Sequence, residues 1–80
     1  MNKATVPLTQ LAEGSKATIA SIDAGSGARD HLINLGLTTG TKITLLKKGG
    51  PGPHLILLNE TRLALGHGMA EKIMVHVRQS

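Results

Sequence analysis

The chain has 80 residues, with nine Lys and Arg against five Asp and Glu for a formal net charge of +4, and it contains no Cys, Phe, Tyr or Trp. A chain of this length forms one domain at most, predicted to span residues 1–80, with a core of Leu, Ile, Val, Ala and Met. The lack of cysteine excludes disulfides and thiolate metal or redox sites, and dispersed charge without aromatic residues argues against nucleic-acid binding.

The N-terminal segment lacks the sustained apolar stretch of a signal peptide. The longest aliphatic run, Leu55–Leu58, is too short to span a bilayer. A small chain without cysteine also fits a reducing compartment. We therefore expect a cytoplasmic protein with no direct membrane insertion.

The first predicted elements are a lid and a strand. Leu8 and Leu11 precede any expected regular element, and we expect both side chains to point inward from a segment lying across the core. Lys16–Asp23 is rich in β-branched residues and predicts a strand. Its imperfect alternation of apolar residues predicts a bulge near Ala20 or Ser21.

The stretch Arg29–Thr41, R-D-H-L-I-N-L-G-L-T-T-G-T, predicts a short helix that ends at Gly36, turns through Gly40 and enters a strand. Leu37 is placed to fold back on the last helical turn. The helical spacing puts three apolar residues on one buried face: Ala28, Leu32 and Leu35.

The remaining chain predicts strands joined by short loops. Thr41–Lys48 is a strand that ends at Gly49–Pro53, where two prolines require a loop or a sheet rim. His54–Asn59 and Arg62–His67 predict a hairpin around the dipeptide Glu60-Thr61. After one turn, the alternating sequence I-M-V-H-V-R predicts the last strand, from residue 73 to 78. About five short strands and one helix predict a mainly β fold, a small antiparallel barrel.

Several of these stretches recur in one known family. They are the opening P-L-T-Q-L-A-E-G, the helix-turn stretch Arg29–Thr41, the R-L-A-L of Arg62–Leu65 and the A-E-K-I-M-V of Ala70–Val75. The unit L-x-x-L-G-L-x-x-G, here Leu32–Gly40, is specific when R-L-A-L follows at this distance. Together they resemble the FeoA family, small cytosolic accessory proteins of bacterial ferrous iron transport, over almost the whole chain.

The resemblance implies an SH3-like barrel and a role at the ferrous iron transporter FeoB, which carries a GTPase domain on its cytosolic side. It also implies kinship with the C-terminal domain of iron-dependent repressors. We therefore expect a non-enzymatic accessory protein that binds a FeoB-type transporter, with an effect on the GTPase cycle and homo-oligomer formation left open. The alternative is a stand-alone metal-responsive regulatory domain. No catalytic residues are predicted, because the acidic residues are scattered and no phosphate-binding motif is present.

Four histidines raise the question of a metal: His31, His54, His67 and His76. If the hairpin turns on Glu60-Thr61, His54 faces His67 at the outer end of its inward face, with Cβ atoms about 4.5–5.5 Å apart. Two imidazoles at that distance fit around one divalent transition metal, although zinc takes about three or four protein ligands. The alternative is a pair of rim histidines at the mouth of the barrel. No cofactor is established, and a metal held by His54 and His67 is a hypothesis.

The other side of the hairpin supplies the candidate partner-binding residues. Leu55 and Leu57 are predicted to point outward, and an exposed apolar patch marks a partner surface. The alternative is that the segment Val6–Leu11 covers both leucines. Arg62 and Arg29 are the candidate charged contacts, because an arginine that reaches a GTPase site stabilises phosphoryl transfer. The alternative interpretation is that both arginines are ordinary solvated charges.

Overall fold

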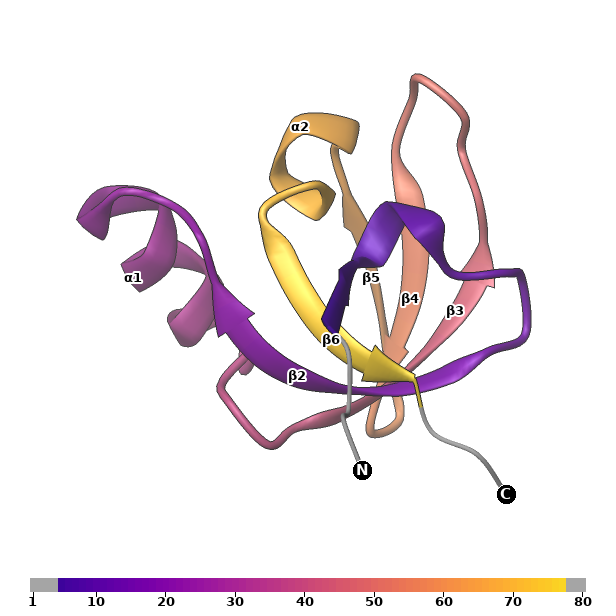
Figure 1. Cartoon of the computed structure of the whole chain (residues 1–80), viewed down its shortest axis with the longest axis horizontal. Helices are drawn as coiled ribbons and strands as arrows, with labels where there is room; N and C mark the ends of the chain where they lie inside the picture. Colours follow the sequence, from indigo (N-terminus) through magenta and orange to yellow (C-terminus); the bar gives the residue numbers. More distant parts are fainter. Residues whose placement is uncertain (1–4, 78–80) are drawn as a thin grey trace.

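The computed structural model describes residues 5–77, which form six strands, two short α-helices and one 3₁₀ turn. The strands build one antiparallel sheet in the order β1-β6-β2-β3-β4-β5, and β2 curves across the molecule (Figure 1). Within residues 5–77, no pairing joins the edge strands β1 and β5 into a closed barrel. The predicted mainly β, SH3-like fold is confirmed, with more strands and helices than expected. The elements are β1 (Thr5–Pro7), η1 (Leu8–Gln10), β2 (Lys16–Ile22), α1 (Ser26–Asn34), β3 (Lys42–Lys47), β4 (His54–Leu58), β5 (Thr61–Leu65), α2 (His67–Ala70) and β6 (Ile73–Val77).

The extra strand is β1, in a segment predicted to precede any regular element. It pairs with β6, from Thr5 opposite His76 to Pro7 opposite Met74. Proline is tolerated there because β1 lies at the edge of the sheet and needs no donor on its open side. The predicted strand from residue 73 is confirmed through Val77, and its last expected residue, 78, lies outside the described residues.

The core consists mainly of aliphatic side chains from the strands and the short helices. Leu8 and Leu11 are 0% and 2% exposed, which confirms that the N-terminal segment points them inward. The turn η1 packs against α2 and β6. The other buried apolar residues are Ala17, Ile19, Ile22, Leu32, Leu37, Ile43, Leu45, Ile56, Leu58, Leu65, Ala70, Ile73 and Val75.

The bulge predicted in β2 is confirmed. The register between β2 and β6 shifts between Ile19 and Ser21. A bulge adds one residue to one strand and so changes which side chains share a face. Ile19 and Ile22 are therefore both buried although strict alternation would place them on opposite faces.

Helix α1 ends as predicted, but a different leucine closes it. Gly36 and Gly40 have φ of +99° and +91°, the left-handed conformation that glycine adopts without strain. The N–H of Leu37 donates to the Leu32 carbonyl (2.9 Å), and both side chains are fully buried. Leu35 is 38% exposed, so the prediction that it points into the core is wrong. The left-handed residue reverses the chain, and Leu37 takes the inward position.

The predicted β4–β5 hairpin forms, but its predicted register is wrong. The strands turn on Asn59 and Glu60, and His54 pairs with Leu65. Asn59 has φ of +57°, a conformation that asparagine tolerates better than most residues. The difference in register is an even number of residues, so each side chain keeps the predicted face of the sheet.

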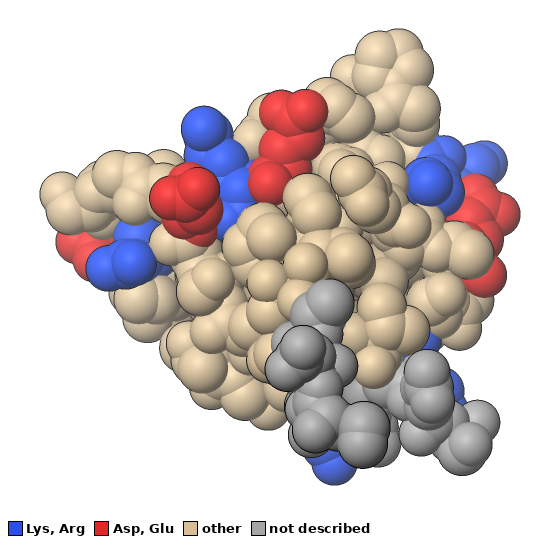
Figure 2. Space-filling model, viewed as in Figure 1, with Lys and Arg blue, Asp and Glu red and all other residues tan. Residues whose placement is uncertain are grey.

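Figure 2 shows charged side chains mostly toward the margins of the viewed surface, around a broad uncharged centre. Basic and acidic groups lie next to one another at those margins. The positive net charge is therefore not gathered into one patch on this face.

Candidate functional site

The outward side of the hairpin combines aliphatic and basic groups. Leu55 lies opposite Ala64, and Leu57 lies opposite Arg62. Both leucines are half-buried, whereas Ala64 and Arg62 are exposed. We call these four residues the hairpin face. Because Arg62 is on the edge strand β5, this face offers a cation beside an apolar centre.

The segment that was the alternative cover for these leucines packs elsewhere. Val6 packs against the core, Leu8 and Leu11 are buried in it, and η1 contacts α2 and β6. Leu46 of β3 is also half-buried and extends the apolar area beside the hairpin face. The arrangement suits contact with another surface.

His54 and His67 come together, but by a route different from the predicted one. His54 is 1% exposed, so it belongs to the core, and the expectation that it stands at an open rim is wrong. His67 is the first residue of α2, not part of strand β5. The Nε2 of His54 lies 3.1 Å from the Nδ1 of His67. The other two histidines lie apart from this pair: His31 is exposed on α1, and His76 is half-buried on β6.

The hydrogen bonds around the pair fix which nitrogens carry protons. The backbone N–H of Gly49 donates to Nδ1 of His54 (3.2 Å), so the neutral imidazole carries its proton on Nε2. The Nε2–H of His54 donates to Nδ1 of His67. The proton of His67 is then on its own Nε2, which lies 3.3 Å from Oε2 of Glu71. We call this the histidine chain, from Gly49 to Glu71. It ties the loop after β3 to β4 and α2.

The histidine chain competes with the metal hypothesis. A metal on Nε2 of His54 requires the single proton of a neutral imidazole to move to Nδ1, where it faces the N–H of Gly49. Among the residues that the structure describes, no group of three or more His, Cys, Asp or Glu side chains is placed to hold a metal ion. The His54–His67 metal site stays an untested hypothesis, and the histidine chain argues against it.

The tautomers of the two imidazoles give a direct test. We expect ¹⁵N NMR to show His54 as the Nε2–H tautomer, and we expect added Zn²⁺ or Fe²⁺ to leave His54 and His67 no more shifted than the exposed His31. The reason is that both nitrogens of His54 already have hydrogen-bond partners. A selective shift of His54 and His67 that saturates at one metal per chain would establish the metal site instead.

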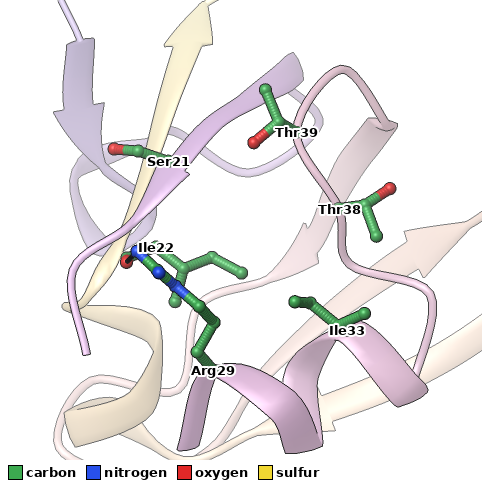
Figure 3. Close-up of a pocket in the computed structure, with 6 residues that line it drawn as sticks. All are labelled: Ser21, Ile22, Arg29, Ile33, Thr38 and Thr39. Carbon is green, nitrogen blue, oxygen red and sulfur yellow. Dashed lines mark hydrogen bonds between the residues drawn. The ribbon is translucent and has the colours of Figure 1, made fainter. Parts of the chain in front are cut away.

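A pocket of about 410 Å³ lies where the end of β2, helix α1 and the loop before β3 meet (Figure 3). It is lined by Ser21, Ile22, Arg29, Ile33, Thr38 and Thr39. The Nη2 of Arg29 donates to the carbonyl of Ile22 (3.2 Å), which holds the guanidinium at the side of the pocket next to the end of β2. The two arginines predicted as partner contacts therefore serve different surfaces, Arg29 in the pocket and Arg62 on the hairpin face.

The other lining residues of the pocket are not among the predicted site residues. Ser21, Thr38 and Thr39 lie in segments for which the sequence predicts only a bulge and a turn. One signal was present in Ile33, an aliphatic residue outside the predicted buried face of the helix. It is 42% exposed and lines the pocket.

A small antiparallel β domain with this strand order belongs to the class of SH3-like folds. The FeoA domain family model matches residues 6–77, so the chain belongs to the FeoA family of non-enzymatic accessory proteins. This membership confirms the resemblance inferred from the motifs and the prediction that the chain is not an enzyme. Within the described residues, no helix is long and apolar enough to cross a membrane.

Relatives and solved structures agree with this assignment. The chain is 36% identical over 69 residues to the "Putative Fe(2+) transport protein A" of Methanocaldococcus jannaschii, covering 86% of this chain and 83% of that protein. It resembles the crystal structure of an iron uptake regulatory protein, FeoA, with a TM-score of 0.87 and 35% identity, covering 94% of this chain and 100% of that one. The fold is shared with a manganese-dependent transcriptional repressor at a TM-score of 0.86 and 19% identity, covering 98% of this chain and 44% of that one. The structural relationship to repressors of this kind is thereby confirmed.

Proposed function

We propose that this chain is a cytoplasmic, single-domain accessory protein of ferrous iron uptake that binds the cytosolic side of a FeoB-type transporter. It acts by protein–protein contact through the hairpin face and alters the GTPase cycle of the transporter. Family membership and the Fe(2+) transport name of the Methanocaldococcus jannaschii relative support the iron-uptake context.

The hairpin face is the observation that carries the contact mechanism. Leu55 and Leu57 lie on the outward side of β4 and are half-buried. Solvent-facing strand positions are usually polar, so two leucines there favour burial against a partner. Arg62 beside them supplies a charge that orients such a contact.

Replacing both leucines, Leu55→Ser and Leu57→Ser together, tests this mechanism. Each buried leucine contributes about 1.5–3 kcal/mol to an interface, so we expect the transporter's cytosolic region to bind at least about tenfold more weakly. Affinity is measured by calorimetry, with circular dichroism to confirm that the variant is folded. Val77→Ser is the matched control, because Val77 is 48% exposed on β6, away from the hairpin face. Unaltered affinity and oligomeric state in the double variant would refute the role of the hairpin face.

The alternative function is a stand-alone, metal-responsive regulatory domain. The observation that bears on it is the His54–His67 pair, which places two potential ligands 3.1 Å apart. The experiment is the ¹⁵N NMR titration with Zn²⁺ or Fe²⁺ described above. Tight, selective metal binding at His54 and His67, with no binding to the transporter's cytosolic region, would favour this alternative. Transporter binding without selective metal binding supports the accessory function.

A further inference from the structure

The pocket beside α1 is separate from the hairpin face. It is built from the end of β2, the middle of α1 and the loop that follows, whereas the hairpin face belongs to β4 and β5. Its volume of about 410 Å³ falls within the range of small-ligand sites. The pocket therefore offers a second surface with its own chemistry.

The polar lining of the pocket contains one cation. Its polar residues are Ser21, Thr38, Thr39 and Arg29. A guanidinium carries several N–H donors in a planar fork that matches a carboxylate. Among the described residues, Arg29 has no carboxylate within 4.0 Å, and its side chain donates to the Ile22 carbonyl. The guanidinium is thus oriented by the backbone while most of its donors remain free for an anion.

The hydroxyls are also held in place. Oγ1 of Thr38 lies 2.9 Å from Oγ1 of Thr41, and Oγ1 of Thr39 donates to the carbonyl of Ala20 at 3.4 Å. In Figure 3 the threonines stand across the pocket from Ser21 and Arg29. A hydroxyl carries one proton: Thr41 donates its own to the Gly36 carbonyl, so Thr38 donates to Thr41. Thr39 donates to Ala20, which leaves Arg29 as the charged donor that an anion in the pocket meets.

The remaining lining is aliphatic. Ile22 is nearly buried, and Ile33 is 42% exposed at the side of the pocket. An exposed isoleucine next to an arginine and several hydroxyls fits a ligand that carries both a short aliphatic group and a negative charge.

We propose, on the basis of the partner-binding function above, that this pocket binds a carboxylate side chain next to an aliphatic residue on a partner polypeptide. Arg29 binds the carboxylate, and Ile33 packs against the neighbouring aliphatic side chain. The pocket thereby selects an acidic-aliphatic pair within the partner sequence.

Two short peptides test the proposal without the transporter. The acidic probe is N-acetyl-Glu-Leu-amide, and the neutral probe is N-acetyl-Gln-Leu-amide, which has nearly the same shape. We expect the acidic probe to shift the backbone amide signals of Ile33, Thr38 and Thr39 in NMR titrations. The neutral probe should bind about tenfold more weakly, because it lacks the charge-assisted bond to Arg29.

Two arginine variants locate the effect. Arg29→Gln should lower the affinity for the acidic probe about tenfold, to the affinity for the neutral probe. Arg62→Gln is the matched control and should change nothing, because Arg62 lies outside the pocket. If Arg29→Gln does not fold, the comparison of the two probes on the unaltered protein still decides the matter.

Equal affinity for the two probes, or shifts confined to residues outside the pocket, would overturn the proposal. Free 4-methylpentanoate serves as a third probe for the source of the carboxylate. Tighter binding of that acid than of the acidic peptide would show a small-molecule site and overturn the polypeptide ligand. None of these outcomes depends on the transporter. If the probe titrations contradict the pocket proposal, the hairpin-face contact is unaffected. If the chain does not bind the transporter, the result of the probe titrations is equally unaffected.

Discussion

Gly49→Ala is expected to destabilise the protein by about 3 kcal/mol or more. A Cβ atom on Gly49 would overlap the carbonyl group of Pro53, which is backbone and has no rotamer to adopt. The loop between β3 and β4 must therefore move. Any such movement also pulls the Gly49 N–H away from Nδ1 of His54, which leaves a nearly buried nitrogen without its donor. Urea denaturation followed by circular dichroism measures the loss.

The matched control for this variant lies in the same loop. A Cβ on Gly52 meets its nearest atom, the carbonyl oxygen of Gly49, at an ordinary 3.4 Å. Gly52→Ala should therefore change the free energy of unfolding by no more than about 0.5 kcal/mol. Similar denaturation midpoints for the two variants would contradict the tight approach of Gly49 to Pro53.

The second large effect is expected at His54. His54→Ala removes a side chain that is 1% exposed and should lower the free energy of unfolding by about 2–4 kcal/mol. The cost combines the cavity with two broken hydrogen bonds, one from the Gly49 N–H and one to His67. His31→Ala, at an exposed position on α1, should stay within about 0.5 kcal/mol of the parent.

A second substitution separates packing from hydrogen bonding at this site. His54→Leu refills much of the volume but accepts no hydrogen bond from Gly49, so it should recover only part of the loss. A double-mutant cycle with His67→Ala should show a coupling free energy of about 0.5–3 kcal/mol, as for residues in direct contact. Additive effects of the two substitutions would mean that the two imidazoles do not interact in solution.

The local parts of the fold could be predicted from the sequence. Alternation in β3 and β6 needs only neighbouring residues, and the Ile19 to Ile22 spacing was enough to indicate the bulge in β2. The glycine turns at the end of α1 were equally local, since a left-handed residue has few candidates other than glycine.

The missed features depend on contacts between distant segments. β1 is three residues long and contains a proline, so only its pairing with β6 makes it a strand. The hairpin register followed from the left-handed Asn59, which puts the turn on Asn59 and Glu60 and not on the predicted Glu60-Thr61. The exposure of Leu35 reflects the chain reversal that gives Leu37 its place.

The candidate sites divide in the same way. Leu55 and Leu57 could be placed on the outward face because strand alternation fixes the face whatever the register. The proximity of His54 and His67 was predicted from a wrong register and arises because α2 turns His67 back over β4. The pocket could not be predicted from the sequence, because its lining residues come from three segments and no local pattern shows that these segments meet.

The histidine chain also gives an NMR signal that reports on the loop between β3 and β4. The N–H of Gly49 is what holds the proton of His54 on Nε2. A bound molecule that displaces the loop Gly49–Pro53 frees the His54 imidazole to exchange tautomers. The hydrogen bond from His54 to His67 then changes as well, so the ring nitrogens of His67 also report the displacement. Because the sequence contains no tyrosine or tryptophan to follow by fluorescence, these two ring-nitrogen signals give a readout of loop displacement that needs no added label.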